Sequence, residues 1–182
     1  MRYRLNTIAV ILFIVLLSGG CQKDYILSEG QKMVFEQSYI NNAWSYQHKG
    51  FIIDNEGNIL TYDNPERWNF PDSDNILSQE QVNENLKMCK PSGEKIPVSE
   101  LRKFTNYIDN IASSKVSAPK YRGADMGSRG YYCYLYSEAT STYKEFVIKI
   151  EGDMECENLN FYSKRIVDWM NDIQKVLSEE NQ

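Results

Sequence analysis

The part of the chain from 33 to 62 combines aromatic residues with short apolar runs, which indicates β structure there. Two apolar runs, residues 50–53 and 59–62, flank the polar residues 54–58. Runs of this length on either side of a polar turn are typical of a β-hairpin, and Gly57 supplies the positive φ that such a turn needs. The sequence therefore predicts a first hairpin around this turn.

A second hairpin is predicted from residues 131–136 and 146–150, which alternate on either side of a turn. If the turn is centred on residues 140–141, Cys133 lies opposite Ile148 and one face of the hairpin is apolar. We expect the other face to be half exposed to solvent, although a row of tyrosines can also be a contact surface. That face carries Tyr132, Tyr134 and Tyr136.

Three segments, 78–88, 99–113 and 158–177, repeat apolar residues at three- and four-residue spacing and predict helices. The first begins with a capping box formed by Ser78 and Gln81. The last has the broadest apolar stripe, and we expect it to cover the apolar face of the second hairpin and form the main core. Its stripe consists of Leu159, Tyr162, Ile166, Trp169, Ile173 and Leu177.

The order of these elements indicates the fold class. Hairpin, two helices, hairpin and long helix predict an α+β domain, in which an antiparallel sheet packs against helices on one face. We expect a single domain with a long C-terminal helix over residues 33–182.

The leader of the chain is apolar without any period. Residues 8–17 are all apolar, follow Arg2 and Arg4, and precede the small residues 18–20. A run of ten is too short for a transmembrane helix, which needs about 20 apolar residues. This pattern predicts a signal peptide over residues 1–20.

The end of the leader also resembles the bacterial lipobox, in residues 17–21, Leu-Ser-Gly-Gly-Cys. The resemblance implies cleavage before Cys21 and attachment of acyl chains, such as palmitate, to that residue. An ordinary secretory signal with a chance cysteine is the alternative. Residues 21–32 would then be the lipidated cysteine and a polar tether, and Gln22 would imply the outer membrane if the cell is Gram-negative.

Composition and charge limit the partners. The chain is 42 % hydrophobic and 13 % aromatic, which predicts a packed domain instead of a disordered chain. Loss of the leader leaves 18 basic residues against 25 acidic ones, a net charge of −7. An acidic domain disfavours nucleic acid and anionic lipid headgroups, so we expect membrane contact through acyl chains on Cys21 and no nucleic-acid partner.

Two stretches, residues 63–75 and 114–130, have no periodicity. The first carries Trp68 and Phe70, which either pack onto the domain or contact a ligand. The second is locally basic around Arg122 and is either an anion or partner site or a solvated loop, since it lacks the spacing of a phosphate loop. With two residues from the first β-rich segment added, the candidate binding residues are Trp44, His48, Trp68 and Arg122.

His48 is the only histidine, and it could act as a general base for a serine or cysteine. No G-x-S-x-G motif marks a nucleophile, so an exposed or hydrogen-bonded residue at the start of a strand is the simpler interpretation. A histidine-rich zinc site is impossible with one histidine. We therefore expect no catalytic residue, no metal and no cofactor.

Three cysteines remain beyond Cys21. In an oxidising envelope two of them could pair, and Cys89 and Cys156 are the candidates because both fall in predicted loops. Cys133 is explained as a small core residue, although a Cys133–Cys156 pair or three free thiols stay open.

Two passages, residues 42–50 with 53–58 and residues 130–134 leading to 167–169, resemble uncharacterised lipoproteins of anaerobic bacteria. That resemblance implies a cell-envelope location, facing the periplasm or the exterior, and brings no assigned activity. We expect a lipid-anchored binding or interaction module for a protein or glycan partner. The alternatives are an envelope inhibitor or immunity-type lipoprotein and, less favoured, a hydrolase that uses His48.

Overall fold

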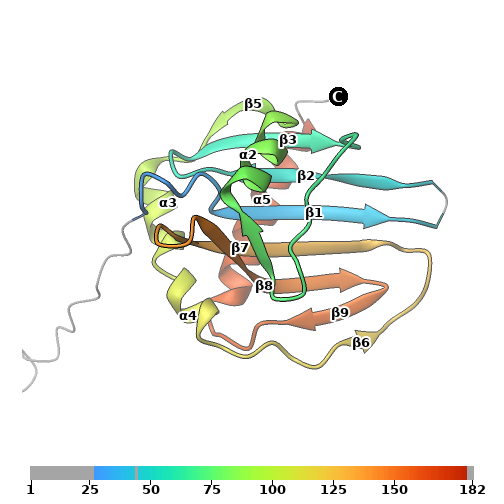
Figure 1. Cartoon of the computed structure of the whole chain (residues 1–182). Helices are drawn as coiled ribbons and strands as arrows, with labels where there is room; N and C mark the ends of the chain where they lie inside the picture. The colour runs from blue at the N-terminus through green and yellow to red at the C-terminus, as the bar shows by residue number, and fades with distance from the viewer. Residues whose placement is uncertain (1–26, 44, 180–182) are drawn as a thin grey trace, which may run out of the picture.

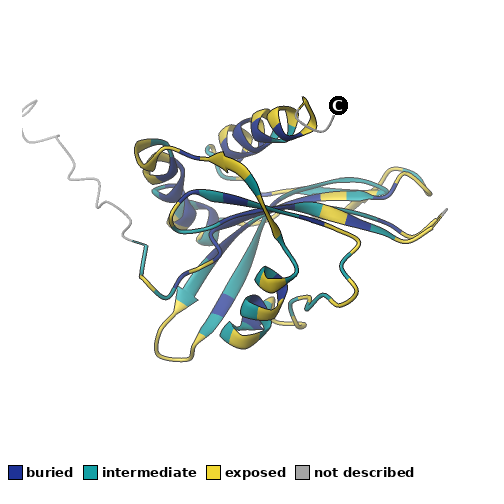
Figure 2. Cartoon of the chain, turned by 90° about the horizontal axis from the view of Figure 1, so that it is seen from above, coloured by how far each residue is buried: buried dark blue, intermediate teal, exposed yellow. Residues whose placement is uncertain are grey.

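The computed structural model describes residues 27–43 and 45–179, which form one α+β domain (Figure 1). The predicted signal peptide, the predicted lipid attachment site Cys21 and the candidate binding residue Trp44 lie outside the described residues. A single antiparallel sheet runs through the middle of the domain, and helices lie on both of its faces (Figure 2).

The strands are β1 (Phe35–Asn41), β2 (Gln47–Ile53), β3 (Asn58–Asp63), β4 (Ile76–Ser78), β5 (Lys90–Lys95), β6 (Lys120–Tyr121), β7 (Ser128–Ser137), β8 (Thr142–Gly152) and β9 (Met154–Glu157). The helices are α2 (Gln79–Lys87), α3 (Val98–Thr105), α4 (Ile108–Ala112) and α5 (Ser163–Glu179).

The sheet has the strand order β5-β3-β2-β1-β7-β8-β9-β6, and β4 pairs with β8 beside this path. Strand β1 lies in the middle and joins the two predicted hairpins, β2–β3 and β7–β8. The first hairpin is confirmed, since Ile53 pairs with Ile59 and Gly57 has φ 84°. Several short strands were not predicted: β5 replaces an expected turn, and β6 lies within the expected loop 114–130.

The second hairpin is confirmed, but its predicted register is wrong by two residues. Cys133 pairs with Phe146, not Ile148, because the turn lies earlier and Ser137 already pairs with Thr142. A shift of two residues keeps the side chains on their expected faces as far as the bulge between Tyr131 and Tyr132, beyond which the pairing moves by one residue. Cys133 and Ile148 therefore both still belong to the apolar core.

The apolar core lies on the face of the sheet covered by α3, α4 and α5, which we call the α5 face. Trp169 of α5 stacks on Phe104 of α3, with ring centroids 4.0 Å apart, and donates from Nε1 to Glu100. Helix α5 also contacts β8, and its Ile166 and Met170 belong to the same core as Cys133 and Ile148, so the predicted covering of the second hairpin by the C-terminal helix is confirmed.

Two helix boundaries differ from the prediction. The single helix expected over residues 99–113 is divided into α3 and α4, and Tyr107 at the break stacks on Tyr162 at 4.1 Å. Helix α5 begins at Ser163 instead of residue 158, because the side chains of Asn158 and Asn160 accept hydrogen bonds from backbone N–H groups two residues ahead.

The opposite face of the sheet carries a second core, which was not predicted. Helix α2, strand β4 and residues 64–75 cover this face of the sheet, which we call the α2 face. We call residues 64–75 the cover segment. The expected half-exposed tyrosine row is wrong at its centre, because Tyr134 is 1 % exposed. Part of the expected tether also belongs to the domain, since Gln31 is buried and donates to the Tyr134 carbonyl.

Candidate functional site

The central strand β1 carries a carboxyl group into the α2 face. Glu36 is 6 % exposed, and the hydroxyl of Tyr62 donates to its Oε1 at 2.7 Å. Tyr62 reaches β1 from β3 by crossing over Gly50 of β2, where an added Cβ would lie 2.7 Å from the tyrosine oxygen. Glycine is therefore needed at this crossing, and the sheet itself holds the carboxyl group in place.

A second carboxyl group shares a tyrosine with the first. The Tyr134 hydroxyl lies 2.5 Å from Glu36 Oε2 and 2.8 Å from Glu145 Oε2. A phenol has one proton and can donate to only one of these oxygens. The other contact is a hydrogen bond only if that carboxyl is protonated and donates to the tyrosine oxygen. The geometry therefore places one proton on the Glu36–Glu145 pair.

Burial favours the same protonation state. Desolvation raises the pKa of Glu36, and desolvation together with the charge of Glu36 raises the pKa of Glu145 to about 7. Hydrogen bonds from the tyrosines lower both pKa values, but burial outweighs them. Because the two acids interact, the proton belongs to the pair and not to one residue.

The cover segment is attached to α2 above this pair, chiefly by Asn85, and the Asn69 side chain also donates to Glu84 at 3.0 Å. Asn85 is 1 % exposed, and its side chain accepts from the backbone N–H of Asn69 and donates to the Asn69 carbonyl, both at 2.8 Å. The Asn85 amide therefore makes the backbone hydrogen bonds that a neighbouring strand would make, and it does so for a segment without regular structure. This contact positions the residues on either side of Asn69, which are Trp68 and Phe70.

His48 of β2 lies beneath those two aromatic residues. Its ring centroid is 5.2 Å from that of Trp68 and 5.3 Å from that of Phe70. The residue is 1 % exposed, and within the described part of the chain its Nδ1 has no hydrogen-bond partner. Burial lowers the pKa of His48 to about 4, so the imidazole is neutral at pH 7.

These groups line a cavity of about 90 Å³ between the α2 face and the cover segment. Its wall combines acidic, aromatic and small polar side chains, and no lysine or arginine of the described residues contributes to it. The lining consists of Glu36, Ser38, Ile40, His48, Trp68, Asn69, Phe70, Pro71, Leu77, Asn85, Tyr132, Tyr134 and Glu145.

Of the predicted binding residues, the structure brings His48 and Trp68 together and leaves Arg122 apart. Arg122 follows β6, at the other end of the strand order, where its Nε lies 2.6 Å from Glu155. Among the described residues a carboxylate already pairs with this guanidinium, so the expected anion site at Arg122 gains no support.

The predicted Cys89–Cys156 disulfide is wrong, because Cys89, Cys133 and Cys156 are all free thiols. Cys89 precedes β5 and Cys156 lies in β9, toward opposite ends of the strand order. The sequence placed both cysteines in loops, but it did not show that most of the sheet lies between Cys89 and Cys156.

A role for His48 as the base of a hydrolase gains no support from this geometry. A general base needs a nucleophile within about 3 Å, and within the described residues Nδ1 contacts none. A pKa of about 4 also makes the imidazole a weak base at neutral pH. Among the described residues no three His, Cys, Asp or Glu side chains are grouped to hold a metal ion.

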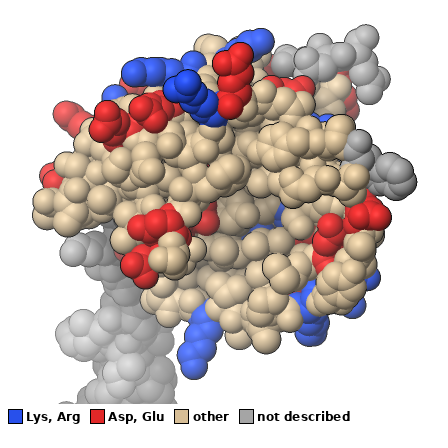
Figure 3. Space-filling model, turned by 45° about the vertical axis from the view of Figure 1, so that its right-hand side comes forward, with Lys and Arg blue, Asp and Glu red and all other residues tan. Residues whose placement is uncertain are grey.

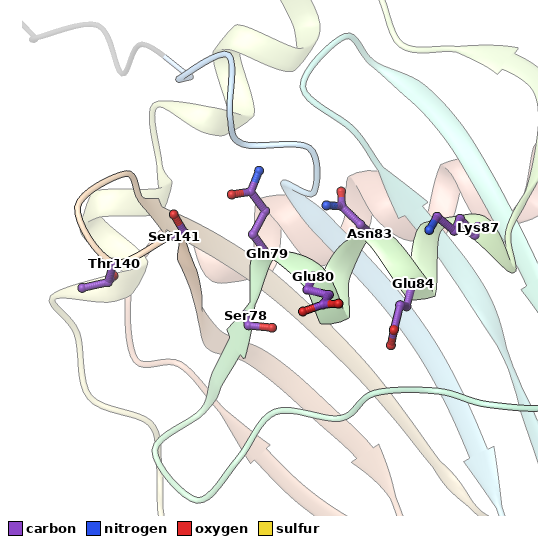
Figure 4. A pocket seen from close by; sticks show the side chains of 8 residues that line it. All are labelled: Ser78, Gln79, Glu80, Asn83, Glu84, Lys87, Thr140 and Ser141. Atoms are coloured by element: carbon purple, nitrogen blue, oxygen red, sulfur yellow. The ribbon is translucent and has the colours of Figure 1, made fainter.

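Two other surface depressions lack a cluster of buried polar groups like that of the cavity. One lies beside α2 and the turn at Thr140 and Ser141, and its polar side chains point outward without converging (Figure 4). The other is a broad groove of about 930 Å³ on the α5 face, lined in part by Lys49 and Arg129. On the face that Figure 3 shows, acidic and basic side chains are interspersed, and no extended patch of one sign forms.

Comparisons of this chain with protein-family models, curated proteins and solved structures find no match. Within residues 27–43 and 45–179, no helix is both long and apolar enough to cross a bilayer. The interpretation of the cavity therefore depends on its own residues.

Proposed function

We propose that the protein is a lipid-anchored binding protein of the cell envelope, and that the cavity under the cover segment is its ligand site. The resemblance of residues 17–21 to a lipobox supports the anchor on Cys21. The single observation that carries the binding role is the buried polar content of the cavity: two carboxyl groups and an imidazole nitrogen without a partner.

Buried polar groups of this kind lower the stability of the fold unless a ligand binds to them. A buried polar atom without a hydrogen bond costs about 1–3 kcal/mol, and a buried carboxylate without a cation costs more. An apolar residue at either position would avoid this cost. A ligand that supplies hydrogen-bond donors to the carboxyl groups and the imidazole offsets it.

The test uses the full lipidated protein in detergent and a panel of small envelope compounds, which includes amines, amino acids, neutral sugars and peptidoglycan fragments. We expect at least one class to raise Tm by several degrees. The effect should be lost in Ser38→Leu, which fills the cavity from β1.

Lys49→Ala is the matched control, because Lys49 follows His48 on β2 but points to the opposite face. It should keep the response of the wild type. If no compound class shifts the Tm of the wild type, or if Ser38→Leu responds as the wild type does, the cavity is not a ligand site.

A further inference from the structure

The chemical class of the ligand can be inferred from the same cavity, and this step rests on the proposed binding role. We propose that the cavity binds a primary alkylammonium group, with the nitrogen at the Glu36–Glu145 pair and the carbon chain against the aromatic rings of the cover segment. The recognised chemistry is R–NH3+, whether it belongs to a free amine or to an amino group on a peptide.

The charge balance of the cavity favours a cation. Glu36 and Glu145 both border it, and no lysine or arginine of the described residues does. In a poorly solvated site, a carboxylate gains much more from a nearby cation than it would in water. The rings of Trp68 and Phe70 add faces that attract a cation and cover its carbon chain.

The other titratable groups around the pair do not supply the missing positive charge. Burial raises the pKa of the tyrosines and thiols that interact with Glu36 or with Tyr132 beside it, so they stay neutral, and His48 is neutral at pH 7. Those groups are Tyr62, Cys89, Tyr132, Tyr134 and Cys156.

Binding exchanges one proton for one cation. In the empty site the O–H bond of one carboxyl group donates to the Tyr134 oxygen. When the ammonium enters, this O–H bond breaks and the proton leaves to solvent. An N–H of the ligand then donates to the freed carboxylate, and no electron transfer is involved.

The size of the cavity and the unpaired atom of His48 narrow the class further. About 90 Å³ is far below the 300–1,000 Å³ of a site for a drug-sized molecule, so only a short chain fits. His48 borders the same small cavity as Glu36, so its Nδ1 is available to a second polar group of the ligand.

The test is isothermal titration calorimetry of the full lipidated protein in detergent with n-butylammonium chloride at pH 6, 7 and 8. We expect the affinity to rise about fivefold from pH 6 to 7 and about tenfold in all by pH 8, since one proton with a pKa of about 7 must leave. Titrations at pH 6 in two buffers of different ionisation enthalpy should show the release of about one proton. Nα-acetyl-lysine methylamide is the peptide-borne probe, and the tighter of the two amines identifies the source.

Glu145→Gln should weaken n-butylammonium at least tenfold and remove the pH dependence. Glu151→Gln, on the same strand but beside Lys149 outside the cavity, should bind as the wild type does. Equal binding of n-butanol, tighter binding of tetramethylammonium, or binding without proton release overturns the ammonium assignment. Each of those results is compatible with a ligand site of another specificity. If no compound of the envelope panel shifts the Tm, the binding role itself is contradicted.

Discussion

At the scale of residues, one tyrosine hydroxyl determines the state of the site. The Tyr134 hydroxyl contacts both Glu36 and Glu145 but has only one proton to donate, so one of the two carboxyl groups must carry a proton as well. Asp or Glu in a sheet interior is rarely fully buried without a partner of opposite charge. The shared proton takes the place of that partner, and it makes the stability of the domain sensitive to pH.

Glu145→Gln should stabilise the protein at pH 8 and not at pH 5. The folded-state pKa of Glu145 is raised from 4.5 to about 7, so the folded state holds a proton that the unfolded state has lost between these pH values. The wild type therefore loses stability as pH rises from 4.5 to 7, and the full penalty is present above pH 7. A neutral amide removes it, and we expect a gain of about 1–2 kcal/mol at pH 8 after allowance for partial exposure.

Urea unfolding of the variant and the wild type at pH 5 and pH 8 measures this difference. The lowered pKa of His48 has the opposite effect, because it removes stability as pH falls from 6.5 toward 4. That contribution is the same in both proteins and cancels in the comparison. A variant that is less stable at pH 8 than the wild type would contradict the shared proton.

At the scale of elements, α2 has two roles. Its capping box is formed as predicted, with Ser78 and Gln81 each accepting from the backbone N–H of the other. The same helix presents Asn85 to the cover segment, which has no regular structure to hold it. Trp68 and Phe70 are therefore held over the cavity largely by side chains of a nine-residue helix.

Asn85→Ala should release the cover segment and leave the sheet intact. The change removes the hydrogen bonds to the N–H and carbonyl of Asn69 and leaves both groups without that partner, which we expect to cost about 2–3 kcal/mol. Hydrogen exchange measured by mass spectrometry should become at least tenfold faster in residues 64–75 and stay unchanged in α5. Asn83→Ala, two residues earlier on the same helix and outside the cavity, should leave the exchange of both segments unchanged.

The hairpins, α2 and most of α5 could be predicted from the sequence because local spacing determines them. His48 and Trp68 could be selected as candidates because histidine and tryptophan are rare in this chain, with one and three residues. Glu36 could not, since a glutamate in a polar-looking stretch resembles any exposed residue until β1 is placed at the centre of the sheet. Glu145 was missed for the same reason, although its position on a strand one residue before Phe146 was a usable signal.

At the scale of the whole molecule, the two faces of the sheet have different roles. The α5 face carries the larger apolar core, and the α2 face holds the polar cavity. The chain packs on the domain from Leu27 onward and runs directly into the central strand β1, which carries Glu36. An anchor at Cys21 would therefore leave only about six residues between lipid and fold, or at most about 21 Å of extended chain. The cavity would stay close to the membrane surface.

Cys21→Ser should abolish this attachment. Two or three acyl chains anchor firmly because each buried methylene contributes about 0.8 kcal/mol, whereas a precursor with a serine offers no thiol for the diacylglycerol. Cells fed an alkyne analogue of palmitate should label the wild type and Cys156→Ser, whose thiol lies in β9, but not Cys21→Ser. Mass spectrometry of the mature wild type should find an N-terminal peptide that begins at Cys21 and carries the acyl chains. A bare cysteine there, or a leader still attached, would contradict the anchor and leave the cavity and its ammonium ligand to be tested on their own.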